Sequence, residues 1–246
     1  MRACMAAILA ALASAAAPPR AAGQDRGAAA AASTGPGSNA IASAPVDLTG
    51  FWVALVTEDW RFRMVTPRKG DYRAVPLTEA ARTIADTWDP AADEATGNQC
   101  KAYGAGAIMR AATRFHFTWL DENTLQVESD YGMQTRLFHF KAPPSPPRER
   151  SWQGYSIAEW QKPASLKVTT TNMLSGYLRK NGVPYSENAS VTEYFDMAPL
   201  PRGGQVLLVT TIVDDPQSLQ QPFIVSSQFR EEADGSKWDP MPCTAR

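Results

Sequence analysis

Histidine and carboxylate side chains are the residues of this chain that could support acid–base or metal chemistry. The chain contains two histidines, His116 and His139, in alternating segments that predict strands of one meander, so the two rings could face each other. A metal site would also need carboxylates, such as Glu193 or Asp215. The spacings His-x-x-x-His, Cys-x-x-Cys and Gly-x-Ser-x-Gly do not occur in the sequence. The simpler interpretation is that both histidines pack within strands, and we expect no metal, no cofactor and no assignable catalytic residue.

Two charged residues, Arg136 and Glu193, lie inside otherwise apolar strands. By alternation, Arg136 shares a face with Phe138, while His139 points to the other face. A charge that faces a barrel interior is costly unless it is paired or binds a ligand, so either charge could anchor an acidic or polar ligand. An exterior salt bridge is the simpler alternative. The candidate ligand-binding residues are Trp52, Arg136, His139, Glu193 and Tyr194.

A series of short strands would position these side chains. Alternating apolar and polar residues, β-branched and aromatic residues, and intervening turn signals predict about ten strands. They are 51–56, 60–66, 113–119, 124–129, 133–140, 154–161, 166–171, 190–195, 205–213 and 223–231. Because most of them are sequential neighbours, the pattern favours an antiparallel barrel or a strongly curved sandwich.

One short helix is predicted in this mostly β chain. It begins near Thr78, which can cap its first turn, and it ends at Asp89-Pro90. Its apolar stripe consists of Ala80, Ala81, Ile84, Ala85 and Trp88. We expect solvated loops around Asp93 and Glu94 and over residues 172–188, and a Pro-rich linker over residues 141–150.

The first strand carries a Gly-x-Trp pattern at Gly50 and Trp52. This pattern resembles the lipocalin and calycin signature, in which the tryptophan plugs one end of a barrel. The resemblance implies a lipocalin- or calycin-like antiparallel barrel. The alternative is a tryptophan that packs in another kind of β core.

A more specific motif lies in residues 154–171. The run Gly154 to Trp160, followed by Leu166 to Thr171, resembles the Gly-x-Ser-Ile-Gly-x-Trp block of a large family of secreted bacterial proteins of unknown function. The resemblance extends to the Asp-Leu-Thr-Gly-Phe-Trp run at 47–52 and to segments within 184–195 and 211–223, and so covers nearly the whole domain. Ala158 stands where the family has glycine, and residues 161–164 replace its Gly-Asp turn. The resemblance implies a secreted location and a β architecture, but no activity.

The N-terminal region has the order of an export signal. A positive residue, Arg2, precedes a short apolar run and small residues at Ala13 and Ala15, which predicts a signal peptide over residues 1–15. Residues 16–46 are rich in Ala, Gly, Ser and Pro and predict a disordered linker. A single β-barrel-like domain is predicted over residues 47–246, in the periplasm or outside the cell. An uncleaved Ala-rich tail is the alternative.

Charge and hydropathy argue against nucleic acid as the main partner and against a membrane-spanning segment in the mature chain. The net charge is −1, and residues 1–46 hold three arginines and one aspartate, so residues 47–246 carry −3. An acidic domain without a basic run argues against nucleic acid as the main partner. Beyond the signal region, no apolar run reaches the roughly 18 residues that span a bilayer. The sequence does not indicate an oligomeric state.

Two cysteines remain once the signal peptide, with Cys4, is removed. Cys100 follows the predicted helix and Cys243 lies near the end of the chain. In an oxidising compartment the default state of two thiols is a disulfide, so we predict a bond between Cys100 and Cys243.

Taken together, these patterns predict an exported barrel that binds a small hydrophobic or acidic molecule. Two alternatives remain open at this point. The first is a hydrolase or isomerase that uses His116 or His139 with Glu193 in a barrel cavity. The second is a structural envelope protein without a ligand.

Overall fold

The computed structural model of the chain describes residues 39–141, 147–201 and 203–246. The expected signal peptide and most of the expected linker lie outside these residues. The last part of the linker, from residue 39, belongs to the folded unit: Ala40 is buried, its N–H donates to the carbonyl of Glu122 at 3.0 Å, and its carbonyl accepts from Trp160 Nε1 at 3.0 Å. The folded unit therefore begins before residue 47.

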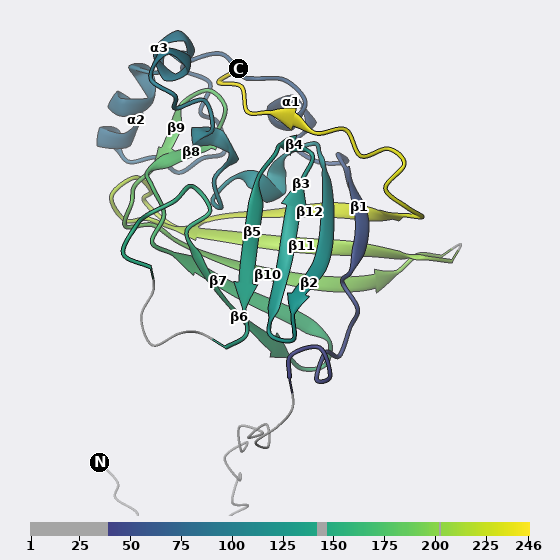
Figure 1. Ribbon diagram of the computed structural model, residues 1–246. Helices are drawn as coiled ribbons and strands as arrows, with labels where there is room; N and C mark the ends of the chain where they lie inside the picture. The colour runs from purple at the N-terminus through teal and green to yellow at the C-terminus, as the bar shows by residue number, and fades with distance from the viewer. Residues whose placement is uncertain (1–38, 142–146, 202) are drawn as a thin grey trace, which may run out of the picture. The chain divides into compact units, whose positions relative to one another are not determined.

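Nine strands form a closed barrel, which confirms the predicted mostly β fold (Figure 1). Each strand is paired with its neighbours antiparallel, apart from β5 and β6, which run parallel. Around the barrel the order is β1 (Gly50–Leu55), β12 (Phe223–Glu232), β11 (Gln205–Asp214), β10 (Ser190–Pro199), β7 (Ser165–Thr171), β6 (Tyr155–Gln161), β5 (Thr135–His139), β3 (Thr124–Ser129) and β2 (Arg114–Asp121). Because β2 also pairs with β1, these strands leave no open edge.

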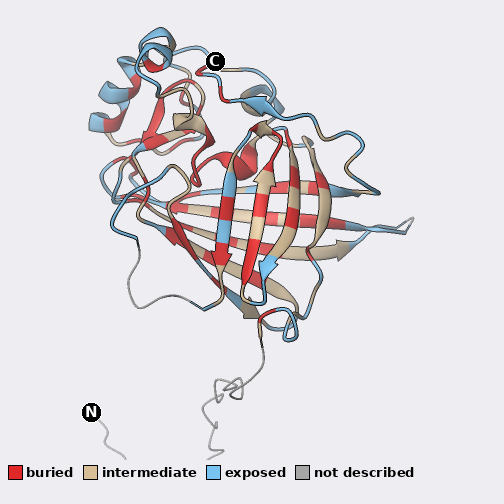
Figure 2. Cartoon of the chain, in the orientation of Figure 1, coloured by how far each residue is buried: buried red, intermediate tan, exposed pale blue. Residues whose placement is uncertain are grey.

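Side chains fill the interior of the barrel. Buried and less buried residues alternate along the strands, as period-2 geometry requires (Figure 2). Trp52 is 1% exposed, and its Nε1 donates to the carbonyl of Leu48 at 3.0 Å. The other interior residues with 1% exposure or less include Phe115, Phe117, Leu125, Val127, Phe138, Leu166, Val168, Phe195, Leu207, Val209 and Phe229. Burying such a side chain stabilises the fold by about 1.5–3 kcal/mol, so the core is also the main source of stability.

The segment after β1 differs from the prediction. Residues 60–66 were expected to form a strand, but Trp60–Arg63 form the short helix α1 and the strand prediction is wrong. The physical reason is the closed barrel: β1 already pairs with β2 and β12, so the next segment finds no free edge.

Helix α2 (Glu79–Asp86) forms where the helix was predicted. Thr78 Oγ1 accepts a hydrogen bond from the N–H of Ala81 at 3.1 Å, and Ala81 and Ala85 are buried, whereas Ile84 of the predicted stripe is exposed. The solvated loop predicted beyond it is instead helix α3 (Pro90–Ala95). Asp89 caps α3 by accepting from the N–H of Ala91 at 2.9 Å. Pro90 follows in the first turn of the helix, a position to which proline is well suited.

Small elements gather around one end of the barrel (Figure 1). The loop predicted over 172–188 holds a hairpin of β8 (Gly176–Arg179) and β9 (Val183–Tyr185). Two single-turn 3₁₀ helices, η1 (Lys101–Tyr103) and η2 (Ile108–Arg110), lie between α3 and β2 in the chain. The short strands β4 (Tyr131–Gly132) and β13 (Met241–Pro242) pair in parallel. Among the described residues, no helix has the length and apolarity to cross a membrane.

Three glycines make room for the ring of Tyr185 in this cap. A Cβ atom on Gly104 would lie 2.3 Å from the Tyr185 hydroxyl, and one on Gly176 would lie 2.6 Å from it. A Cβ on Gly106 would approach the ring at 3.1 Å. The Gly-Ala-Gly run thus serves close packing of the hairpin on the η1–η2 segment.

The disulfide between Cys100 and Cys243 is present, as predicted. It joins residues 143 positions apart and fixes the chain end that follows β13 beside η1. In this position the backbone carbonyl of Arg246 accepts a hydrogen bond from Lys180 Nζ at 2.9 Å. The bond therefore holds the chain end against the β8–β9 hairpin.

We expect the double substitution Cys100→Ser and Cys243→Ser to lower the free energy of unfolding. Because the bond closes a long loop, the chain-entropy model gives a loss of roughly 4–5 kcal/mol, less any native strain. Urea denaturation measures this loss. Non-reducing peptide mapping of the wild-type protein provides the control, and free thiols at both positions would refute the bond.

Candidate functional site

The two charges predicted from sequence meet inside the barrel. Arg136 Nη1 and Nη2 donate to the two carboxylate oxygens of Glu193 at 3.0 and 2.6 Å, and the two side chains are 1% and 0% exposed. Arg136 Nη2 also donates to Thr170 Oγ1 at 3.2 Å, and this hydroxyl lies 2.7 Å from Ser156 Oγ. The pair is an interior salt bridge, so the exterior alternative is wrong. Because the guanidinium is already paired, these contacts give Arg136 a structural role.

The other predicted site residues do not join this pair. His139 and Tyr194 lie on the outer face of the wall, since they alternate with the interior residues Phe138 and Glu193. His139 stacks on Tyr155 with ring centroids 5.2 Å apart, and partial burial lowers its pKa. Trp52 is buried in the core, so it does not share a surface with His139 and Tyr194 on the outer face of the barrel.

The pairing of histidine with Glu193, which the hydrolase or isomerase alternative requires, is not formed. His116 faces outward, where Nδ1 lies 3.4 Å from Glu128 Oε2. In the register, His116 lies opposite Glu128 while His139 lies opposite Thr124, four residues away on β3. The two rings therefore do not face each other, and the barrel wall separates both from Glu193. In the described residues, no cluster of three or more His, Cys, Asp or Glu side chains could hold a metal.

A cleft at the capped end of the barrel is a stronger candidate. It has a volume of about 330 Å³, within the range of small-molecule sites. Five of its lining residues are basic, and no Asp or Glu from the described part of the chain lines it. The basic residues are Arg63, Arg110, Arg179, Lys180 and Arg246. The remaining lining is mostly apolar or aromatic, and includes Phe62, Met64, Val65, Leu178, Tyr103 and Tyr131.

Three of the arginines are held rigidly behind the cleft. The side chains of Arg63, Arg110 and Arg179 are 2%, 7% and 1% exposed and come from α1, η2 and β8. Arg63 Nε donates to the carbonyl of Arg110 at 2.8 Å, and Arg110 Nη1 donates to the carbonyl of Leu178 at 3.1 Å. These hydrogen bonds join three distant segments of the chain into one cationic cluster, which we call the arginine cluster.

Acidic residues neutralise the arginine cluster only in part. Arg63 pairs with Glu58, and Asp59 pairs with Arg110 and, at 3.6 Å, with Arg179. Asp59 has a left-handed backbone with φ of 52°, which aspartate tolerates better than most residues. Three guanidiniums thus share two carboxylates, and Arg63 Nη2 and Arg179 Nε have no hydrogen-bond partner among the described residues.

The pKa values of the arginine cluster reflect its burial and, at Arg110, the neighbouring positive charge. Burial, followed by the nearby charge of Arg179, lowers the pKa of Arg110 to about 10, so the group remains charged at neutral pH. Burial also lowers the pKa of Arg63 and of Arg179. A bound anion would stabilise the charged forms by opposing this desolvation.

Lys180 and Tyr131 form the more exposed side of the cleft. Lys180 Nζ donates to Tyr131 Oη at 2.8 Å and lies 4.8 Å from the ring centroids of both Tyr131 and Tyr103. Burial by itself would raise the pKa of Tyr131, but hydrogen bonds from Lys180 and its neighbours and the charge of Lys180 lower it to about 8. Tyr131 can therefore ionise at mildly alkaline pH.

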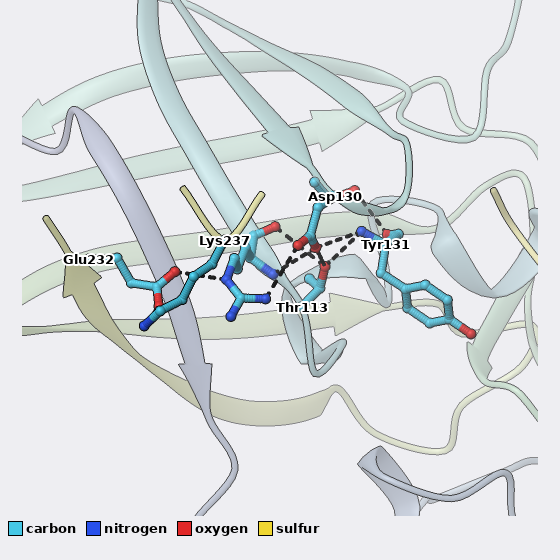
Figure 3. A network of polar contacts seen from close by, with 7 residues as sticks. Thr113, Asp130, Tyr131, Glu232 and Lys237 are labelled. Carbon is cyan, nitrogen blue, oxygen red and sulfur yellow. Dashed lines mark hydrogen bonds and ion pairs between the residues drawn. The ribbon is translucent and has the colours of Figure 1, made fainter. Parts of the chain in front are cut away.

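A network at the barrel rim fixes the backbone of Tyr131 (Figure 3). Buried Asp130 accepts from the N–H of Tyr131 at 2.6 Å, from the N–H of Arg114 at 2.9 Å and from the Thr113 hydroxyl. Arg114 Nε in turn donates to Glu232 at 2.7 Å. In Figure 3 the phenol ring points away from this network, which leaves its hydroxyl for Lys180.

The sequence patterns did not reveal this cleft. Its basic residues come from short elements and turns that carry no periodicity, and they meet only when the cap closes on the barrel. The adjacent Arg179 and Lys180 were a signal, but a weak one, because paired basic residues are common on surfaces. No protein-family model, curated protein or solved structure matches the chain. The chemistry of the site therefore carries the functional conclusion.

We expect Arg136→Met to lower the free energy of unfolding by about 3–5 kcal/mol, because it leaves Glu193 buried without its partner. The double variant Arg136→Met with Glu193→Leu should cost less than the single one. The matched control is Lys167→Met, which removes the exposed pair with Glu159 (2.7 Å) and should cost under about 1 kcal/mol. Equal losses at the buried and the exposed pair, measured by urea denaturation, would contradict this role.

Proposed function

We propose that this protein is exported and binds a small amphiphilic anion, with a carboxylate, phosphate or sulfonate head, in the cleft beside the arginine cluster. The observation that carries the proposal is the lining of the cleft: five basic residues, no acidic residue from the described chain, and a mostly apolar remainder. Arginine and lysine donate charge-assisted hydrogen bonds to such heads. The apolar residues would contact the body of the ligand.

Export is supported by three features. The Cys100–Cys243 disulfide is of a kind that persists in oxidising compartments. The signal-like N-terminus and the resemblance to a family of secreted bacterial proteins support the same location. All three features are compatible with a periplasmic or secreted binding protein.

The binding site proposed here lies outside the barrel interior. Core side chains fill that interior, and Arg136 and Glu193 bind each other there. The cleft instead uses the rim and the cap, which are more adaptable than a packed core. The hydrolase or isomerase alternative requires a histidine beside Glu193, but in the described residues both histidines face outward and Glu193 pairs with Arg136. A structural envelope role remains the outcome if no ligand binds.

Octyl phosphate, octanol and octylamine test the proposal because they share a chain and differ in charge. We expect octyl phosphate to bind most tightly in isothermal titration calorimetry. Lys180→Ala should weaken this binding by about ten- to a hundred-fold, since a charge-assisted hydrogen bond contributes about 1.5–3 kcal/mol. Lys162→Ala, in the β6–β7 turn, is the matched control. The proposal fails if octanol binds as tightly as octyl phosphate, or if the two variants behave alike.

We also expect anion affinity to fall with rising pH. Below pH 8 the Tyr131 phenol is neutral, and above pH 8 its phenolate adds a negative charge that repels a bound anion. Octanesulfonate is the appropriate ligand, because its head does not titrate in this range. Affinity should be constant near pH 7 and fall several-fold by pH 9, whereas Tyr131→Phe should abolish the fall. A fall that persists in Tyr131→Phe would assign the effect to another group.

A further inference from the structure

A second surface lies beside the cleft and is built differently. Trp60, Met64 and Val65 are 63%, 59% and 61% exposed, on and just after helix α1. Large apolar side chains gathered at one place on a surface usually mark an interaction site. We call this surface the α1 face.

The inner side of α1 explains why the apolar side chains point outward. Phe62 lies under the guanidinium of Arg179, 4.1 Å from its ring centroid, and Arg63 is buried in the arginine cluster. These two residues attach α1 to the fold. Trp60 and Val65 are not needed for this attachment, and both line a shallow groove of about 1020 Å³ on the outer side.

The groove is strongly basic for such an acidic domain. Its lining includes Arg61, Arg68, Lys69 and Arg73 against a single acidic residue, Asp71, a net charge of +3. Residues 47–246 as a whole carry −3. The side chains of Arg61 and Arg73 are 52% and 66% exposed, so their charges reach solvent. The charge of the α1 face therefore complements an anionic partner.

We propose that the α1 face docks on an anionic lipid bilayer. Tryptophan prefers the boundary between headgroups and acyl chains, and long basic side chains reach anionic headgroups around it. Trp60 and Val65 are both exposed at the same groove, which suits shallow insertion between lipids. The proposal does not depend on the ligand of the cleft, although Val65 and Thr66 line both the groove and the cleft.

Sedimentation with vesicles tests the docking directly. We expect the full chain to sediment with vesicles that contain phosphatidylglycerol and not with vesicles of phosphatidylcholine alone. Salt at about 0.15 M should weaken the binding, because it screens charges across the surface. Equal binding to both vesicles, or binding to neither, would overturn the proposal; the second result would leave an acidic protein as the better partner for this face.

Substitutions then locate the docking surface. Trp60→Ala, and separately Lys69→Glu, should each reduce vesicle binding about ten-fold. The matched controls lie at the opposite end of the barrel: Leu120→Ala, at a side chain 59% exposed near the end of β2, and Lys162→Glu. Because all these side chains are exposed, circular dichroism should show unchanged folding. Controls that reduce binding as much as the α1 variants would refute the assignment.

A variant in the cleft distinguishes vesicle docking by the α1 face from anion binding in the cleft. Lys180→Ala should leave vesicle binding unchanged while it weakens octyl phosphate binding. Trp60→Ala and Lys69→Glu should weaken vesicle binding and leave octyl phosphate binding unchanged. If Lys180→Ala abolishes vesicle binding, the lipid headgroup enters the cleft and the α1 face is not the docking surface.

Discussion

The hydrogen bonds that join β1 to both β2 and β12 close the barrel, and this closure governs the rest of the molecule. A closed ring of nine strands has no edge on which another segment can add. The segments that follow β1 and precede β2 must therefore fold as helices and turns over one end of the barrel. The functional groups proposed here belong to the cap that these segments form with the β8–β9 hairpin and the chain end, which the disulfide fixes beside η1.

The barrel interior and the cap differ in how their buried positive charges are balanced by carboxylates. Inside, one arginine meets one glutamate with two hydrogen bonds, and Arg136 also donates to the Thr170 hydroxyl, which lies beside that of Ser156. In the cap, three buried guanidiniums share two partly exposed carboxylates. A balanced buried pair is a structural feature, whereas an uncompensated cluster beside a cleft retains a capacity to bind anions. This difference in balance, rather than the presence of charge, distinguishes the two sites.

The cap also depends on contacts between segments that are far apart in the chain. Tyr131 comes from the rim after β3, Lys180 from the turn after β8, and Arg246 from the chain end fixed by Cys243. Asp130 joins the first of these to the barrel by accepting hydrogen bonds from two backbone N–H groups. Loss of any of these supports would alter the cleft without breaking the barrel, because the strand pairing does not depend on them.

The sequence by itself determined the class of fold, the positions of most strands, helix α2 and the Cys100–Cys243 pair. These features follow from local periodicity, capping and the counting of thiols, which need no knowledge of distant contacts. It also identified Arg136 and Glu193 as unusual. Period-2 alternation shows which residues share a face of a strand but not which face is interior, so only the closed barrel decided that both side chains point inward and pair. Helix α1 was misread as a strand because alternation cannot show that no sheet edge is free. The arginine cluster was invisible because its members are single residues on separate short elements, and only tertiary structure brings their charges together.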